Sequence, residues 1–167
     1  MESIILIGPP GAGKSSIGKA LAKRLNLAFL DTDQVVEGEA GKSIAEIFLE
    51  EGEASFRSLE KRAVLDSLTT QNAVISLGGG AILDPQTQES LRDKANVVFL
   101  DVSISNAAPR VGFNRDRPLL LGNPRQQWLS LMEKRRPIYE QLAKFTVSTD
   151  NRKVNEVVRE LEEIFSK

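Results

Sequence analysis

The stretch IILIGPPGAGKSS at residues 4–16 decides the fold of this chain. Its first four residues form a short apolar, β-branched run, which is typical of a strand buried in a parallel sheet. The next eight follow the spacing G-x-x-x-x-G-K-S, whose glycines let the backbone curl until successive N–H groups point at one anion. Apolar residues then recur at helical spacing over residues 16–25. A glycine-rich turn without a ligand is the alternative, but the strand before the loop and the helix after it favour a P-loop.

A P-loop predicts a nucleoside triphosphate as ligand. The helix that follows the loop would present its positive dipole end and its N–H groups to the phosphates. Lys14 is expected to reach the β- and γ-phosphates, and the Ser15 hydroxyl to bind Mg²⁺. The predicted nucleotide-binding residues of the loop are Gly11, Ala12, Gly13, Lys14, Ser15 and Ser16.

Composition limits the other possibilities. The chain has 167 residues, enough for one domain that buries roughly 70% of its unfolded surface. Its net charge of −1 provides no overall field that would attract nucleic acid or a membrane. It contains no cysteine and no histidine, so a proton acceptor must be Asp or Glu, and a bound metal is expected to have oxygen ligands. No apolar run approaches the ~20 residues that span a bilayer, and no signal peptide precedes the first strand, so we expect a cytoplasmic enzyme.

Strands and helices alternate along the rest of the chain, which predicts a parallel sheet covered by helices on both faces. Ser43 and Glu46 form an expected capping box, and Gly52 should separate two helices. Pro137 predicts a break or kink in a long helix, and residues 112–124 read as a loop. Further strands are expected at residues 28–30, 73–77, 96–100 and 145–148, and helices at 43–51, 53–68, 85–94, 103–111, 125–144 and 155–165.

Three groups of residues are candidates for binding a second substrate. Asp31 and Asp33 end the second strand, where one carboxylate can support Mg²⁺ through water and the other can meet the substrate. An acidic turn is the alternative. Arg57 and Glu60 share a helix face, so Glu60 can aim Arg57 at a carboxylate, although a solvated ion pair has the same spacing. The glycine triplet, residues 78–80, can bring backbone N–H groups close to a ligand, or can be a flexible turn.

Together these motifs resemble the shikimate kinase family over essentially the whole chain. In order they are the P-loop, LDTD at 30–33, FRxxE at 56–60, GGG at 78–80, RPLL at 117–120 and KRxPxY at 134–139. The resemblance implies transfer of the γ-phosphoryl group of ATP to the 3-hydroxyl of shikimate, a step toward chorismate and the aromatic amino acids. It also implies a fold like that of nucleoside monophosphate kinases, with a five-stranded parallel sheet in the order 2-3-1-4-5. Residues 1–167 would form a single kinase domain, with a substrate-binding region at about 33–61 and a lid at about 112–124.

The resemblance also implies roles for individual residues. Asp33, Lys14 and Arg117 would be catalytic, with Asp33 assisting deprotonation of the attacking hydroxyl and Arg117 closing over the phosphates. The shikimate side would be formed by Asp33, Phe48, Phe56, Arg57, Glu60, Gly79, Gly80 and Arg135, the metal site by Ser15 and Asp31, and the adenine flank by Arg110 and Arg152. Two choices between neighbouring arginines stay open, because Arg136 adjoins Arg135 and Arg115 could share the role of Arg117. Val111 stands where the family pattern has Thr after Arg110.

Three other functions remain as alternatives. A kinase of another small polyol or acid, such as a gluconate kinase, would share the P-loop but would not need Arg57, the glycine triplet and Arg135 in these places. A GTPase switch usually selects its base with an N-K-x-D motif, which this sequence lacks. Against a nucleotide-binding protein without catalysis stand the intact Lys14, Ser15, Asp33 and Arg117. The expected partners are therefore ATP, Mg²⁺ and shikimate, with no nucleic acid or membrane, and we expect a monomer.

Overall fold

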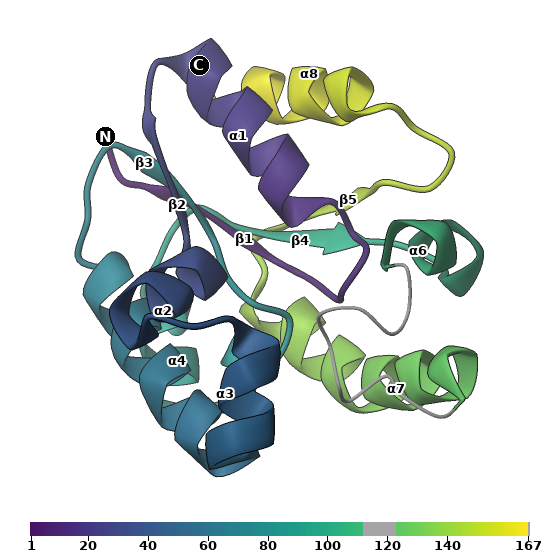
Figure 1. Cartoon of the computed structure of the whole chain (residues 1–167). Helices are drawn as coiled ribbons and strands as arrows, with labels where there is room; N and C mark the ends of the chain where they lie inside the picture. Colours follow the sequence, from purple (N-terminus) through teal and green to yellow (C-terminus); the bar gives the residue numbers. More distant parts are fainter. Residues whose placement is uncertain (112–122, 167) are drawn as a thin grey trace.

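The chain alternates between strands and helices along its length, as the sequence predicts (Figure 1). The computed structural model describes residues 1–111 and 123–166. The strands are β1 (Ile4–Ile7), β2 (Ala28–Asp31), β3 (Ala73–Ser76), β4 (Val97–Asp101) and β5 (Phe145–Ser148). The helices are α1 (Lys14–Leu25), α2 (Thr32–Ala40), α3 (Ile44–Glu51), α4 (Glu53–Ser67), the 3₁₀ turn η1 (Ala81–Leu83), α5 (Pro85–Arg92), α6 (Ile104–Val111), α7 (Pro124–Leu142) and α8 (Val154–Phe165).

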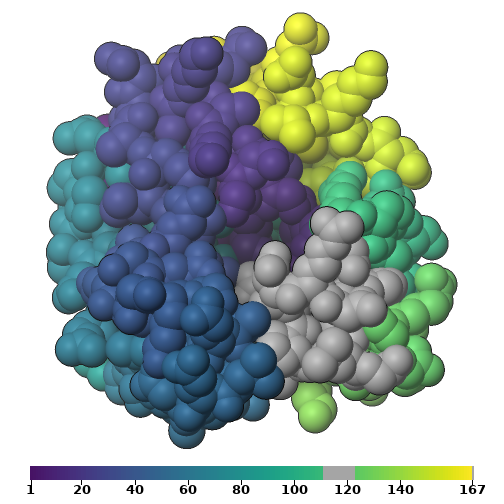
Figure 2. Space-filling view, viewed as in Figure 1, coloured from purple at the N-terminus to yellow at the C-terminus, as the bar shows by residue number. Residues whose placement is uncertain are grey.

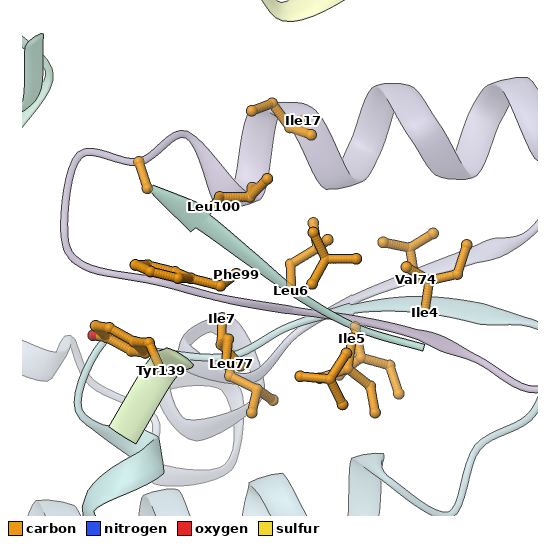
Figure 3. Close-up of a cluster of buried hydrophobic side chains, with 14 of the residues drawn as sticks. Ile4, Ile5, Leu6, Ile7, Ile17, Val74, Leu77, Phe99, Leu100 and Tyr139 are labelled. Atoms are coloured by element: carbon orange, nitrogen blue, oxygen red, sulfur yellow. The ribbon is translucent and has the colours of Figure 1, made fainter. Parts of the chain in front are cut away.

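The five strands form one parallel sheet in the order β2-β3-β1-β4-β5. Strand β1 lies at its centre, where Ile5 pairs with Ile75 of β3 and Leu6 pairs with Val98 of β4. Both faces of β1 are apolar because both are covered. Ile4 and Leu6 lie on the α1 side of the sheet, and Ile5 and Ile7 on the opposite side (Figure 3). The predicted strand order is therefore confirmed.

Helices cover the sheet in two layers. Helices α1 and α8 lie side by side on one face, and α4, α5 and α7 lie on the other (Figure 1). This arrangement makes the predicted three-layer α/β sandwich. Within the described residues, no helix is both long enough and apolar enough to cross a membrane.

A second, smaller apolar cluster holds α2, α3 and α4 together, and it consists of Val36, Ile44, Ile47, Phe56 and Ala63. The capping box at the start of α3 is confirmed, because the Ser43 hydroxyl accepts from the backbone N–H of Glu46 and the Glu46 carboxylate accepts in return. Gly52, with φ of 87°, separates α3 from α4 as predicted. Arg57 follows Phe56 of this cluster in α4, so the packing of the cluster positions Arg57 at the edge of the sheet where the strands end.

Helix α2 was not expected from the sequence. The Asp31 side chain accepts a hydrogen bond from the backbone N–H of Asp33 at 3.0 Å, and it thereby caps a helix rather than closing a turn. The sequence signal is the same in both cases, because an aspartate two residues before a free N–H suits a turn and a helix start equally well.

The expected break at Pro137 is also absent, since α7 is one helix from residue 124 to residue 142. Buried side chains lie on both sides of the proline, with Trp128 and Met132 before it and Tyr139 and Leu142 after it. Packing of both halves against the core stabilises the continuous helix and compensates for the hydrogen bond that the proline cannot donate.

Candidate active site

The P-loop lies between the end of β1 and the start of α1. Gly11 and Gly13 have φ values of 86° and 87°, a backbone conformation that glycine adopts without steric penalty. The Lys14 ammonium donates to the carbonyl oxygens of Gly8 at 2.8 Å and of Pro9 at 3.0 Å, so its side chain folds back across the loop. The loop and the N-terminus of α1 therefore form the anion-binding arrangement that the sequence predicts.

A pair of hard oxygen ligands adjoins the loop. The Ser15 hydroxyl donates to Oδ2 of Asp31 at 2.6 Å, while Oδ1 of Asp31 accepts from the backbone N–H of Asp33. A hydroxyl and one carboxylate fit Mg²⁺, which usually keeps several waters and takes its other ligands from substrate phosphates. In the described part of the chain, no group of three or more His, Cys, Asp or Glu side chains gathers as a metal site. The residues therefore suit a metal ion that arrives with the nucleotide.

A cleft of about 800 Å³ opens above the P-loop. Figure 2 shows the molecule hollowed where the purple N-terminal segment meets the blue segment that holds α2 and α3. Predicted site residues form much of the lining, namely Gly11, Gly13, Lys14, Ser15, Ser16, Asp31, Asp33, Arg110 and Arg152. Its volume is ample for a nucleotide.

Two arginines form the wall of the cleft beyond β5. The Arg110 guanidinium donates to the carbonyl oxygen of Gly11 at 3.1 Å and to the hydroxyl and carbonyl oxygens of Thr149 at 3.2 and 3.3 Å. Arg152 donates to the carbonyl oxygen of Ser148 at 2.9 Å and pairs with Glu160 at 3.0 Å. Both side chains are therefore fixed at the end of the cleft away from Asp33.

The glycine triplet packs against charged side chains that come from three different helices. A Cβ atom added at Gly78 would lie 2.6 Å from Oδ1 of Asp33, and one added at Gly80 would lie 2.5 Å from Nη1 of Arg57. A Cβ atom added at Gly79 would lie 3.5 Å from Nη1 of Arg135. A side chain at Gly78 or Gly80 would displace Asp33 or Arg57, so glycine is required at these two positions for close approach rather than for flexibility.

The two arginines beside the triplet form a positively charged site. Nη1 of Arg57 pairs with Oε1 of the buried Glu60 at 2.8 Å, and Arg135 is only 5% exposed. Burial is the main cause that lowers the pKa of Arg135, the charge of Arg57 lowers it further, and Tyr139 opposes the shift. Because arginine keeps its proton in proteins, both guanidiniums stay charged. Two cations held near one another favour an anion between them.

Asp33 connects the two halves of the site. It lines the cleft above the P-loop, and it also lies beside Gly78, close to a carboxylate oxygen of Glu60. The cleft lining does not extend to Arg57 or Arg135. A nucleotide in the cleft and an acid held by the arginines would therefore meet at Asp33.

Comparison with known proteins gives the family of the chain. A family model described as shikimate kinase matches residues 10–165. The chain belongs to the shikimate kinase family. It is 48% identical to a shikimate kinase of Rhodococcus jostii, over 94% of each chain, and 50% identical to one of Thermobifida fusca, over 87% of this chain and 84% of the relative.

Solved structures agree with this assignment. A shikimate kinase from Acinetobacter baumannii in complex with shikimate superposes with a TM-score of 0.94 at 33% identity, covering 99% of this chain and 94% of that one. The shikimate kinase of Aquifex aeolicus gives a TM-score of 0.83, also at 33% identity, with 99% of both chains covered. The chain is thus a shikimate kinase, an enzyme that phosphorylates shikimate with ATP and Mg²⁺.

The two neighbouring arginines of α7 lie in different places. Arg135 faces the glycine triplet, whereas both Nη atoms of Arg136 pair with the Asp101 carboxylate at 2.8 and 2.9 Å. Arg136 also lies over the Phe99 ring, 5.7 Å from its centroid. Arg115 and Arg117 lie outside the described residues.

The two phenylalanines differ in exposure. The rings of Phe48 and Phe56 lie 4.9 Å apart, but Phe56 is only 1% exposed, whereas Phe48 is partly exposed. The Arg57 guanidinium lies 5.2 Å from the centroid of the Phe56 ring. Phe56 thus packs behind Arg57, and Phe48 is the ring of the two that has exposed surface for a ligand.

Sequence reasoning missed three residues that hold the loops of this kinase in place. The Thr32 hydroxyl accepts from the backbone N–H of Gly78 at 3.2 Å. Trp128 and Tyr139 donate to carbonyl oxygens of the P-loop and the glycine triplet. The apolar periodicity of residues 128–139 indicates a buried face, but it does not reveal which backbone groups the polar ends of these side chains meet.

Proposed function

We propose that Asp33 orients the 3-hydroxyl of shikimate and assists its deprotonation while the γ-phosphoryl group of ATP is transferred to it. The observation that carries this proposal is the position of Asp33, which both lines the nucleotide cleft and packs beside the glycine triplet. Phosphoryl transfer depends mainly on positioning and charge neutralisation, so one carboxylate at this junction is sufficient as a base.

On the donor side, the P-loop N–H groups and Lys14 would hold the phosphates of ATP. Ser15, and Asp31 through water, would hold Mg²⁺, which when bound offsets the negative charge on the transferring group. Arg110 and Arg152 would flank the adenine, in keeping with their fixed positions on the cleft wall. Arg117, assigned from the family resemblance, would close over the phosphates from a lid at residues 112–124.

On the acceptor side, Arg57 and Arg135 would bind the carboxylate of shikimate, and backbone groups of Gly79 and Gly80 would contact the same molecule. Glu60 would hold Arg57, with Phe48 and Phe56 packing near the ring. A pair of arginines, one buried and one partly exposed, is a fitting complement to a small carboxylic acid, because a carboxylate accepts bidentate hydrogen bonds from a guanidinium. These residues define a substrate-binding region at about 33–61, completed by the glycine triplet and α7.

The proposed step is a displacement at the γ-phosphorus of ATP. The oxygen of the 3-hydroxyl forms a bond to the γ-phosphorus as the bond from that phosphorus to the bridging oxygen of ADP breaks. The proton of the hydroxyl passes to the Asp33 carboxylate, and ADP leaves with the bridging oxygen and its electron pair. The products are shikimate 3-phosphate and ADP.

We further propose that the enzyme works as a cytoplasmic monomer without nucleic-acid or membrane partners. The net charge of −1 supports the absence of nucleic-acid and membrane partners, because it gives no overall attraction to polyanions or anionic lipid. Sedimentation of the purified chain would test the oligomeric state.

The direct test is a coupled assay of ADP formation with Mg²⁺ and ATP. We expect ADP release to depend on shikimate, and not on gluconate, because the arginine pair selects a carboxylate at a fixed distance from Asp33. Release with gluconate alone, or binding of GTP at least as tight as ATP without any acceptor, would contradict the proposal.

Substitution of Gly80 by alanine tests the arginine site without removing a charge. The new Cβ atom would lie 2.5 and 2.7 Å from the two Nη atoms of Arg57, so the guanidinium must move. We expect the KM for shikimate to rise about tenfold, because one partly exposed charge-assisted contact is worth about 1.5 kcal/mol, the lower end of the usual range. The KM for ATP should stay the same in steady-state assays.

Gly38→Ala is the matched control. Gly38 lies in α2, and a Cβ atom there would meet nothing within 4 Å. We expect it to leave both KM values unchanged and to raise stability by about 0.5–1 kcal/mol, as removal of a helical glycine usually does. An unchanged KM for shikimate in Gly80→Ala would mean that Arg57 does not bind the substrate.

A further inference from the structure

One face of α7 contacts both substrate loops, which are the P-loop and the glycine triplet. Trp128, Met132, Arg135 and Tyr139 are spaced by four, three and four residues, so they form a single stripe along the helix, and all four are buried. Arg135 belongs to the site already described. The two aromatic residues at the ends of the stripe each carry one polar group, and each polar group reaches a different loop.

Trp128 reaches the P-loop. Its indole N–H donates to the carbonyl oxygen of Pro10 at 2.9 Å, and the side chain is only 2% exposed. Pro10 lines the nucleotide cleft. Because Pro9 and Pro10 have no N–H group, the N–H of Gly11 is the first backbone donor that the loop offers after Gly8.

Tyr139 reaches the glycine triplet. Its hydroxyl donates to the carbonyl oxygen of Gly79 at 2.6 Å, and its ring, completely buried, stacks on Phe99 with a centroid distance of 5.0 Å. Figure 3 shows Tyr139 beneath the end of β1, next to Phe99. The phenol is therefore held firmly and has little freedom to release the carbonyl.

The two loops also touch one another. A Cβ atom added at Gly79 would lie 3.1 Å from Cδ of Pro10 and 3.5 Å from the carbonyl oxygen of Gly8. The P-loop and the glycine triplet are thus close together, and both are hydrogen-bonded to the same helix. Small errors in such a distance have large effects on a transfer reaction, which needs the reacting atoms in line and close together.

A carbonyl held in this way also orients the N–H group that follows it. The trans peptide is planar, so the C=O of one residue and the N–H of the next point in opposite directions. The hydrogen bond from Trp128 to the Pro10 carbonyl therefore directs the Gly11 N–H away from α7. In the same way, the hydrogen bond from Tyr139 to the Gly79 carbonyl directs the Gly80 N–H away from α7. Those two N–H groups belong to the residues proposed above for ATP and for shikimate.

We propose that α7 fixes the positions of the P-loop and the glycine triplet relative to one another. Trp128 is then a positioning residue for ATP, and Tyr139 is a positioning residue for shikimate. The inference rests on the proposed placement of ATP on the P-loop and of shikimate at the glycine triplet. Neither aromatic side chain touches a reacting atom. Trp128 acts through the backbone of the P-loop, and Tyr139 acts through the backbone of the glycine triplet and through its hydrogen bond with the Arg135 side chain. Substitutions of the two should therefore affect the two substrates separately.

The test compares Trp128→Phe and Tyr139→Phe in the full chain. We expect Trp128→Phe to raise the KM and the calorimetric Kd for ATP about fivefold, the ratio that one neutral hydrogen bond confers. Tyr139→Phe should raise the same constants for shikimate about fivefold. In each variant the constants for the other substrate should change by less than about twofold, within the usual error of additivity for separate sites.

Met132→Leu is the matched control, because Met132 lies in the same buried stripe and carries no hydrogen-bond donor. We expect it to leave all four constants unchanged. Trp128 is the only tryptophan of the chain, so its fluorescence is an independent readout. ATP is expected to change its emission in the wild type and in Tyr139→Phe, and the absence of any change would overturn the role of Trp128.

Two further results would overturn the inference. One is an equal rise in the constants for both substrates in both variants, which would indicate general loosening of the core. The other is a lower melting temperature with all constants unchanged, which would make both residues purely structural. A wild-type chain that does not form ADP with shikimate would instead contradict the proposed function, so the two failures are distinguishable.

Discussion

Asp33→Asn is expected to lower turnover by about 10²- to 10⁴-fold, the range that a positioned general base contributes. Asparagine matches aspartate in shape and can still accept a hydrogen bond from the substrate hydroxyl, but it cannot take the proton. Asp33 lies in the first turn of α2, and its oxygen packs beside Gly78, so an isosteric replacement keeps the loop in place. The affinity for ATP should therefore change little.

The measurement is kcat from initial rates, together with the Kd for ATP from calorimetry. Asp31→Asn is the matched contrast, because Asp31 bonds to the Ser15 hydroxyl and belongs to the proposed metal site. That variant should need more Mg²⁺ for half-maximal rate, whereas Asp33→Asn should keep the Mg²⁺ dependence of the wild type. Full turnover in Asp33→Asn would remove this carboxylate from the chemistry.

Arg135→Ala is expected to raise the KM for shikimate by about 30- to 1,000-fold, which corresponds to the loss of about 2–4 kcal/mol when one partner of a buried charge pair is removed. Arg135 is almost completely buried beside the glycine triplet, so no water is at hand to replace it. The KM for ATP should stay close to that of the wild type. Arg135→Lys should restore little, because an ammonium does not provide the planar fork of a guanidinium.

Arg136→Ala is the control that the chain itself provides. Arg136 is the adjacent residue, but its guanidinium pairs with Asp101 at the end of β4. Its loss should lower the melting temperature slightly and leave the KM for shikimate unchanged. If Arg136→Ala raised that KM and Arg135→Ala did not, the assignment of the two arginines would have to be exchanged.

The nucleotide half of the site could be predicted from the sequence because its ligands are contiguous. The loop groups proposed to hold the phosphates come from residues 8–16, and a strand and a helix fix their geometry locally. The strands were predictable for a similar reason, since a strand covered on both faces is an uninterrupted apolar run. The family resemblance added the strand order, which the structure confirms.

The acceptor half depends on residues that are far apart in sequence. Asp33, Arg57 and the glycine triplet were candidates one by one, but their assembly into one site with Arg135 could be predicted only through the resemblance. Asp33, Arg57 and Arg135 come from α2, α4 and α7, and no local pattern says that these helices meet at the glycine triplet. The same applies to Arg110, which contacts Gly11 and Thr149 although Val111 departs from the family pattern.

The sequence by itself determined the P-loop, the five strands and the presence of arginines and one suitable aspartate. Only the tertiary structure showed that Arg135, and not Arg136, lies beside the glycine triplet, because neighbouring residues on a helix point about 100° apart and the packing of α7 selects which one faces the triplet. Only the tertiary structure showed that Trp128 and Tyr139 hold the two loops, because a buried aromatic side chain has no sequence signal for the distant carbonyl that it meets. The P-loop is local chemistry, whereas the distance from it to the second substrate is fixed by long-range packing.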